Sequence, residues 1–289
     1  MELKSILCPI DFSEFSVATY QYAQSLAGYY KSRVVALHVI ELWKNPFAEY
    51  AGYQVDFAKF STALNEGGEM KLQHFVKEYS GEVEPQTVVL QGNAAKCILE
   101  FAQNEDMEGI LMGTHGRRGF DRLVLGSTTD HVIRKAPCPV LVVPNASQRQ
   151  PVSRILYCTD FSNNSERARA YAISLAAEYS AELILFHVGD ASNVANARAI
   201  MDDRTRRLDE LVSHAERKDL NVKSVVRFGK PYEEIVRYAT QEEVSLIIMT
   251  ARGGDTLDRA VFGSTTYRVV QLGPCPVLAV HTDGEAQGN

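Results

Sequence analysis

GSTTDHVIRKAPCPVLVV, residues 126–143, returns later in the same chain as GSTTYRVVQLGPCPVLAV, residues 263–280. When both segments are extended back to residues 113 and 250, 15 of 31 aligned positions are identical. A long run repeated in the same order indicates a duplicated structural unit. The fold to be predicted is therefore one unit used twice.

The duplication reaches the beginning of each copy. ILCPIDFS (residues 6–13) returns as ILYCTDFS (residues 155–162), and the polar segment NASQRQPVS (residues 145–153) lies between the copies. Such a segment is typical of a surface linker. A chain of 289 residues also has a comfortable length for two domains. We predict domain 1 at residues 1–147 and domain 2 at residues 148–289.

Each copy alternates short apolar runs with amphipathic stretches. VVALHVI (residues 34–40) and GILMG (residues 109–113) are examples of the runs, and EFSVATYQYAQSLAGYY (residues 14–30) has a helical pattern. Continuous hydrophobicity in a strand indicates a parallel sheet that is covered on both faces. The predicted class is α/β, with two tandem doubly wound domains and helices on both faces of each sheet. Ligands of such sheets bind beyond the carboxyl ends of the strands.

Composition excludes several classes of function. The net charge of −6 and the pI of 5.7 give no basic footprint for nucleic acid or anionic membranes. No apolar run approaches the ~20 residues that cross a bilayer. The five cysteines form no CxxC pair, so a reducing, cytoplasmic location is expected. Cys138 and Cys275 are predicted to be buried packing residues rather than a zinc or redox site.

Glycines mark one edge of the first unit. Gly113 and Gly116 follow the strand GILMG, and Gly126 precedes a predicted helix, with Ser127 as its N-cap and Asp130 completing a capping box. Amides at a helix start, approached across glycines, can hold phosphate. The alternative is that these glycines only support turns with positive φ. Spacing alone does not decide between the two interpretations.

Familiar catalytic and nucleotide-binding motifs are missing from the sequence. There is no GxxxxGK[ST], GxGxxG, HExxH or GxSxG. No residue is therefore predicted to be catalytic, and none is predicted to bind a metal directly.

The pattern Gly113-x2-Gly116-x9-Gly126-Ser127, with Asp11 after the first strand and Val39 after the second, resembles the ATP-binding universal stress proteins. The likeness covers almost the whole chain, as two fused copies. It implies five parallel strands per domain in the order 3-2-1-4-5. It also implies that the last strands of the two copies pair antiparallel, which makes an intramolecular pseudo-dimer. A homodimer of tandem chains stays open.

The resemblance implies a site for ATP, or for AMP or ADP, with Mg²⁺ or Mn²⁺ on the phosphates rather than on protein ligands. Members of this type that bind ATP tend to be regulators that hydrolyse little or none of the nucleotide. The resemblance implies the following contacts in domain 1: Pro9, Ile10, Asp11 and Val39 for adenosine, and Gly113, Gly116, Gly126, Ser127 and Thr128 for ribose and phosphates. The expected function is a cytoplasmic stress-response protein that uses the nucleotide as a regulatory or protective module.

Domain 2 departs from the pattern at its first glycine, where Thr250 stands. A β-branched residue lacks the freedom and the close approach of glycine. Domain 1 is therefore predicted to be the main site. The other positions are kept, namely Asp160, Val188, Gly253, Gly263, Ser264 and Thr265.

Two other functions fit the same scaffold. A hydrolase or nucleotidyl-group transferase would use His115 or Asp11 to move a proton, and fold alone does not exclude it. A scaffold with empty, degenerate sites is the other alternative. His38 and His187, which lie in apolar strands, are predicted to be satisfied core histidines.

An aromatic stripe distinguishes domain 1 from domain 2. The offset between the copies falls from 149 residues to 137, so domain 1 has 12 more residues before its glycine segment. This region contains residues spaced by three and four, as on one face of a helix: Tyr50, Tyr53, Phe57, Phe60 and Leu64. The stripe is predicted to be core; a cover over a pocket or an interface with a second chain is the alternative.

Overall fold

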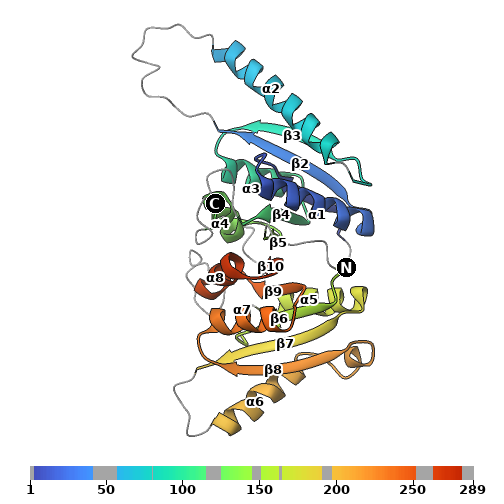
Figure 1. The fold of residues 1–289 in the computed structure, drawn as a ribbon, viewed down its shortest axis with the longest axis vertical. Helices are drawn as coiled ribbons and strands as arrows, with labels where there is room; N and C mark the ends of the chain where they lie inside the picture. The colour runs from blue at the N-terminus through green and yellow to red at the C-terminus, as the bar shows by residue number, and fades with distance from the viewer. Residues whose placement is uncertain are drawn as a thin grey trace.

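The computed structural model describes residues 3–41, 57–79, 81–114, 125–144, 151–162, 165–190, 197–251 and 263–281. Ten strands form one sheet in the order β3-β2-β1-β4-β5-β10-β9-β6-β7-β8, with helices packed on both faces (Figure 1). The predicted boundary between residues 147 and 148 falls in a segment outside the described residues.

Domain 1 is a five-stranded parallel sheet with four described helices. Its strands are β1 (Ser5–Pro9), β2 (Arg33–Ile40), β3 (Gln86–Gln91), β4 (Gly109–Gly113) and β5 (Val140–Val143). Its helices are α1 (Glu14–Tyr30), α2 (Phe57–Glu78), α3 (Ala94–Asn104) and α4 (Ser127–Lys135). All neighbouring strands run parallel, in the predicted order 3-2-1-4-5.

Domain 2 repeats this arrangement. Its strands are β6 (Arg154–Cys158), β7 (Glu182–Gly189), β8 (Val222–Phe228), β9 (Leu246–Thr250) and β10 (Val277–Val280). Its helices are α5 (Glu166–Tyr179), α6 (Ala197–Glu210), α7 (Pro231–Gln241) and α8 (Ser264–Leu272), with a short 3₁₀ turn at Glu216–Lys218. The order β8-β7-β6-β9-β10 is again 3-2-1-4-5 in domain numbering. The predicted fold class is confirmed.

The last strands of the two domains pair with each other. β10 runs antiparallel to β5, and Leu278 lies directly opposite Leu141, its equivalent in the first copy. A pair of equivalent residues facing each other places a pseudo-two-fold axis at this point of the sheet. The predicted antiparallel pairing between the halves of one chain is confirmed, and neither strand is left as an open edge.

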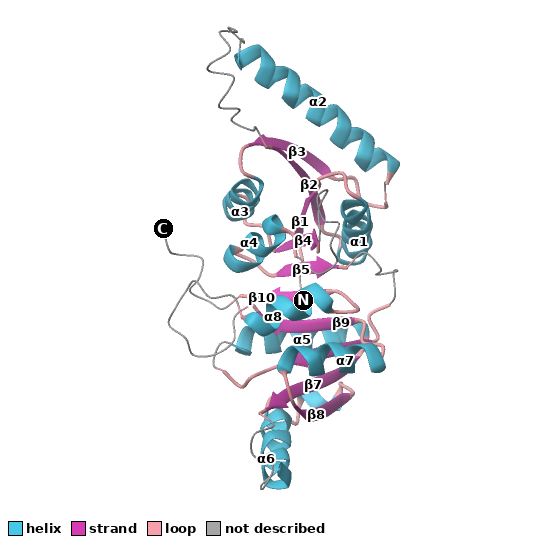
Figure 2. Ribbon diagram, turned by 60° about the vertical axis from the view of Figure 1, so that its left-hand side comes forward, coloured by secondary structure: helices cyan, strands magenta, loops and turns pink. Residues whose placement is uncertain are grey.

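Two hydrophobic layers lie on the two faces of the sheet, and each layer runs through both domains. One layer unites side chains of α3, α4, α7 and α8 with alternate strand residues. The other unites side chains of α1, α2, α5 and α6. Figure 2 shows α1 on the opposite side of the domain 1 sheet from α3 and α4. Because each layer crosses the β5–β10 junction, the two domains share their cores.

A buried polar pair anchors α1. Tyr20 is fully buried and Gln24 is 2% exposed. The Gln24 amide nitrogen donates to the Tyr20 hydroxyl (2.8 Å), and its amide oxygen accepts from the Val83 main-chain N–H (3.3 Å). The Gln24 side chain thus provides a hydrogen-bond partner for a buried hydroxyl on α1 and for a main-chain N–H just before β3.

Replacing Gln24 with alanine is expected to lower the free energy of unfolding by about 1–3 kcal/mol, because a buried hydroxyl and a main-chain amide lose their partner. Urea unfolding followed by circular dichroism measures the change. Gln73→Ala on α2, where the side chain is exposed, is the matched control and should change stability by less than about 0.5 kcal/mol. Equal effects of the two substitutions would contradict this role for Gln24.

The aromatic stripe of domain 1 falls only partly within the described residues. α2 has 22 residues and α6 has 14, so part of the extra length of domain 1 is helix. The core interpretation is wrong for Phe60, which is 51% exposed, whereas Leu64 is half-buried. Residues 50 and 53 lie outside the described residues, as does the side chain of Phe57. The α2 face that packs on the sheet uses Leu72 and Phe75 instead.

No described helix combines the length and the apolar character that a membrane crossing needs.

Candidate functional site

The carboxyl ends of three strands meet at one edge of the domain 1 sheet. β1 lies between β2 and β4. After β1 the chain adds β2 and β3 on one side of it and then crosses to the other side to add β4 and β5, so the direction of strand addition reverses at this point. This is the topological switch point at which ligands of open α/β sheets bind. Pro9 ends β1 and Gly113 ends β4, so the structure brings these two predicted site residues to the same edge.

Main-chain bonds hold the end of β1. The Ile10 N–H donates to the Leu37 carbonyl (2.8 Å), and the Ile10 carbonyl accepts from His38 Nδ1 (2.7 Å). Ile10 is 3% exposed, and Val39 is half-buried against the layer of α3 and α4. The predicted adenosine contacts Ile10 and Val39 therefore lie at the end of the sheet, where the N–H and the carbonyl of Ile10 are both bonded to β2.

Asp11 organises the turn between β1 and α1. Its Oδ1 accepts from the Ser13 main-chain N–H (3.0 Å), the Ser13 hydroxyl (2.6 Å) and the Ser16 hydroxyl. Phe12 has φ of 64°, which lets the chain turn sharply. Ser13 is the N-cap of α1, because its hydroxyl accepts from the Ser16 N–H (3.3 Å). The Asp11 carboxylate is thus held in one position at the carboxyl edge.

The start of α4 differs from the prediction. The N-cap is Gly126, with φ −57° and ψ 135°, and no side chain caps the helix. Ser127 is already the first helical residue, so its hydroxyl cannot take the capping position. Asp130 forms no capping box; its two carboxylate oxygens each accept from Nε of Arg134 (3.0 Å), one turn later. The i,i+4 ion pair competes successfully with the cap.

The backbone angles at the N-cap of α4 indicate why glycine occupies this position. A φ of −57° is open to any residue, so Gly126 is not required for a left-handed turn. Its equivalent Gly263 has φ −60° and likewise no side-chain cap on α8. What glycine provides at these positions is the absence of its own side chain beside the amides of a helix start.

A threonine ties each glycine segment to its strand. Thr129 Oγ1 donates to the Gly113 carbonyl (2.9 Å), and the Gly126 N–H donates to the Thr114 carbonyl (2.9 Å). Domain 2 repeats the first bond, from Thr266 Oγ1 to the Thr250 carbonyl (2.9 Å). The second threonine of the repeated GSTT is therefore a positioning residue that sequence reasoning missed, although the repeat itself was the available signal.

The remaining predicted site residues are placed as follows. Ser127 and Ser264 are exposed, and Thr128 and Thr265 are half-buried, each in the first turn of its helix. Val188 is half-buried near the end of β7. Gly116, Gly253 and His115 lie outside the described residues, so their predicted roles stay predictions.

The turn between β6 and α5 in domain 2 differs from the equivalent turn between β1 and α1. Asp160 is exposed, and its Oδ1 accepts from the Ser162 N–H (3.0 Å). Ser165 occupies the N-cap of α5 but makes no side-chain cap bond. In domain 1 the equivalent serines bond to Asp11 and cap α1. The two domains therefore keep the acid, but the two equivalent serines bond to it only in domain 1.

The two strand histidines are structural, as predicted. His38 Nδ1 bonds to the Ile10 carbonyl, and His187 Nδ1 bonds to the Thr159 carbonyl (2.9 Å). Because a carbonyl only accepts, Nδ1 carries the proton in both rings. His187 is 8% exposed and its ring lies 4.4 Å from that of Phe161. Each histidine fastens the end of one strand to the next.

His187 is expected to make folding sensitive to acid. Burial lowers its pKa, the nearby charges of Arg204 and Arg207 lower it further, and the bond to Thr159 opposes the shift. The unfolded chain then binds the proton more readily, so the free energy of unfolding should fall as pH drops below about 6.5.

An NMR titration of the His187 ring, with urea unfolding at several pH values, checks this expectation. His187→Gln should flatten part of the decline. A His187 ring that titrates above the range of an unfolded-chain histidine would reverse the predicted sign.

The cysteines of the repeated PCPV motif are buried, as predicted. Cys138 is 5% exposed and Cys275 is 6% exposed, and burial raises the pKa of each thiol to about 12. Both therefore stay as neutral thiols. Within the described ranges, no three His, Cys, Asp or Glu side chains gather as potential ligands of a metal ion.

Comparison with known proteins identifies the family. The model of the universal stress protein family matches residues 2–144 and again residues 151–281. A universal stress protein of Methanocaldococcus jannaschii is 34% identical over 142 residues, which cover 48% of this chain and 81% of that protein. A universal stress protein of Synechocystis is 24% identical over 314 aligned residues, covering 96% of this chain and 99% of its own length.

A solved structure shares the whole arrangement. The crystal structure of a universal stress protein from Archaeoglobus fulgidus superimposes with a TM-score of 0.70 at 20% identity, covering 97% of this chain and 99% of that one. At this identity the likeness concerns the fold. The two family matches, one on each half, account for nearly all of the sequence, and the chain belongs to the universal stress protein family as two fused copies of its domain.

Proposed function

We propose that this universal stress protein binds ATP, or AMP or ADP, mainly in domain 1, and acts as a regulatory or protective module in the stress response without efficient turnover. The observation that carries the proposal is the start of α4. It lies at the carboxyl edge of the sheet, and its N-cap residue is a glycine, which makes no side-chain cap bond.

Several features of domain 1 support a phosphate at this helix. The N–H groups of a first turn and the positive end of the helix dipole favour an anion. The Asp130 carboxylate, which would repel phosphate, is neutralised by Arg134 at 2.9 Å. The bonds of Thr129 and Gly126 hold the helix start against the end of β4 before any ligand binds. Such preorganisation lowers the entropic cost of binding.

The proposal assigns adenosine to the edge formed by Pro9, Ile10, Asp11 and Val39. Asp11 suits this role because three donors fix its Oδ1 and so hold the carboxylate at the edge where adenosine is proposed to bind. Mg²⁺ or Mn²⁺ would accompany the nucleotide and be held by its phosphates. When bound, the metal would neutralise part of the phosphate charge.

Domain 2 is the weaker candidate. α8 begins with the same uncapped glycine as α4. However, β9 ends in Thr250, whose side chain is largely buried, where β4 ends in Gly113. The hydroxyls of Ser162 and Ser165 also do not bond to Asp160, whereas the equivalent serines of domain 1 bond to Asp11. A fully formed site is therefore proposed only for domain 1.

The proposal is tested by denaturing the purified protein, identifying any released nucleotide by chromatography, and titrating the emptied protein with Mg–ATP in a calorimeter. One adenine nucleotide per chain is expected, with hydrolysis far below an enzyme-like rate of about 1 per second. No released nucleotide and no heat of binding would exclude the proposal. Sustained turnover would instead favour the hydrolase or nucleotidyl-group transferase.

A further inference from the structure

Two arginines of α6 face the end of β6 in domain 2. The guanidinium carbon of Arg207 lies 4.1 Å from the centre of the Phe161 ring, and that of Arg204 lies 5.8 Å from it. Both side chains are half-buried. Positions three apart share one face of a helix, so both cations point to the same place. That place is the carboxyl end of the first strand of the domain.

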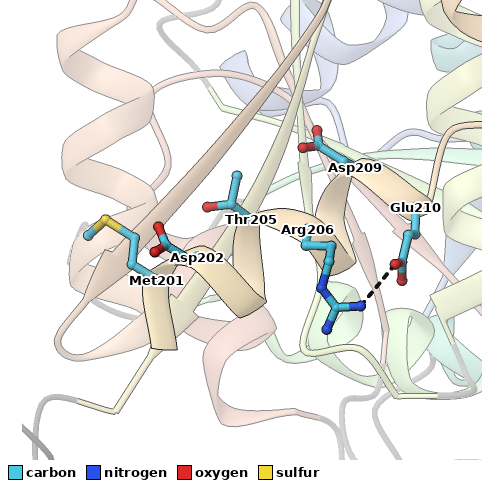
Figure 3. A pocket seen from close by; sticks show the side chains of 6 residues that line it. All are labelled: Met201, Asp202, Thr205, Arg206, Asp209 and Glu210. Atoms are coloured by element: carbon cyan, nitrogen blue, oxygen red, sulfur yellow. Dashed lines mark hydrogen bonds and ion pairs between the residues drawn. The ribbon is translucent and has the colours of Figure 1, made fainter. Parts of the chain in front are cut away.

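Neither cation is neutralised by an acid in the described part of the chain, in contrast to Arg206 between them. Arg206 Nη2 lies 2.6 Å from Asp203 and its Nη1 lies 3.2 Å from Glu210. Figure 3 shows Arg206 directed to Glu210, along a groove of about 510 Å³ that α6 lines with Asp202, Asp209 and Met201 among others. Asp203 and Glu210, which flank Arg207 on the helix, are thus engaged with Arg206.

A second observation points to a missing partner beside Phe161. The hydroxyl of Ser162 is shielded from solvent, and none of the described groups forms a hydrogen bond with it. A buried hydroxyl without a partner costs free energy. α5 begins four residues later, and its N-cap residue Ser165 makes no side-chain cap bond to the first turn.

Domain 1 provides the internal comparison. There the equivalent Ser13 hydroxyl bonds to Asp11 and caps α1, and Phe12 packs on the Phe75 ring, with ring centres 5.8 Å apart. In domain 1 the hydroxyl of this turn is therefore bonded within the turn, and its aromatic ring packs on another aromatic ring. In domain 2 the turn combines an unused hydroxyl, an uncapped helix start and two cations, a set of donors suited to phosphate.

We propose that domain 2 has its own site for a phosphate-bearing anion, formed by Arg204, Arg207, the Ser162 hydroxyl and the first turn of α5. The site is separate from the glycine segment at α8 and does not depend on nucleotide binding in domain 1. Arg207 would contribute through its planar fork while stacked on Phe161. The exposed Asp160 carboxylate opposes the anion, and its charge limits affinity.

The test uses the full chain with Gly126→Asp and Gly263→Asp, so that the helix starts of α4 and α8 are closed to phosphate. Inorganic phosphate is added at constant ionic strength, with chloride as the reference salt, and the ring signals of His187 are followed by NMR. His187 contacts Phe161 and is influenced by Arg204, Arg207 and Asp160. A dianion bound there should shift these signals saturably and favour protonation of the ring.

Arg207→Gln is expected to weaken phosphate binding about tenfold or more, as loss of a charge-assisted bond does. Arg204→Gln and Ser162→Ala should weaken it several-fold, and Asp160→Asn should strengthen it. Arg206→Gln, whose cation is already paired, is the matched control and should leave affinity unchanged. Thermal unfolding shows which variants stay folded, and Arg204→Gln covers the case in which loss of the Phe161 stacking unfolds Arg207→Gln.

Two results would overturn the proposal. One is the absence of a saturable His187 shift with phosphate in the millimolar range. The other is an equal loss of affinity in Arg206→Gln and Arg207→Gln, which would show general attraction to a positive surface. Because both glycine sites are closed in the test protein, failure here leaves the nucleotide proposal for domain 1 untouched, and the reverse also holds.

Discussion

Gly126→Asp is expected to abolish nucleotide binding in domain 1 while the protein stays folded. The cap already has the extended backbone that an N-cap residue needs, so aspartate fits without strain. Its carboxylate would accept the amides of the first turn of α4, and these amides are the groups proposed to hold phosphate. In this variant the introduced carboxylate therefore occupies the position proposed for the phosphate of the nucleotide.

The expected loss of affinity is large. Hydrogen bonds to a charged group contribute about 1.5–3 kcal/mol each, and losing two of them lowers affinity more than about a hundredfold. Stability should stay equal or rise by a few tenths of a kcal/mol, because glycine is a slightly weaker cap than aspartate. Calorimetric titration with Mg–ATP and thermal unfolding measure the two quantities on the same sample.

Gly263→Asp in domain 2 is the matched control, because α8 has the same uncapped glycine. It should leave the affinity of domain 1 unchanged. Unaltered binding by Gly126→Asp would show that the start of α4 does not hold the phosphates. Loss of binding by Gly263→Asp alone would move the site to domain 2.

Much of the fold could be predicted because its signals are local and repeated. Buried parallel strands read as continuous apolar runs, and the repeat showed that one unit occurs twice. The resemblance then supplied the strand order and the antiparallel pairing of the two last strands, and the structure adds the register, with Leu141 opposite Leu278. These features depend on burial and on backbone bonds, which do not change when surface residues differ between the copies.

The details of the site were harder to predict because they depend on competing partners. Asp130 had two possible roles at the start of α4, and the pair with Arg134 prevailed. The spacing of aromatic residues by three and four placed Phe60 in the core, but α2 packs on the sheet through Leu72 instead. The contact of Arg207 with Phe161 joins residues far apart in the sequence, and no local pattern indicates it.

Leu278→Asp is expected to destabilise both domains together by about 4 kcal/mol or more. Leu278 is 9% exposed and faces Leu141 in the layer shared by α1 and α5. The substitution removes a buried leucine and introduces a carboxylate without a partner. A loss of this size is a large part of the 5–15 kcal/mol that stabilises a typical protein.

Leu272→Asp is the matched control, because Leu272 ends α8 in the same domain and is 37% exposed. An acid at a helix C-terminus should cost only about 1 kcal/mol. Hydrogen exchange reports each domain separately: in Leu278→Asp, protection should fall in β1 and β4 as well as in β6 and β9. The reason is that both hydrophobic layers cross the β5–β10 junction, so neither domain can open there without exposing the core of the other. Loss of protection confined to domain 2 would mean that the shared layers do not couple the halves energetically.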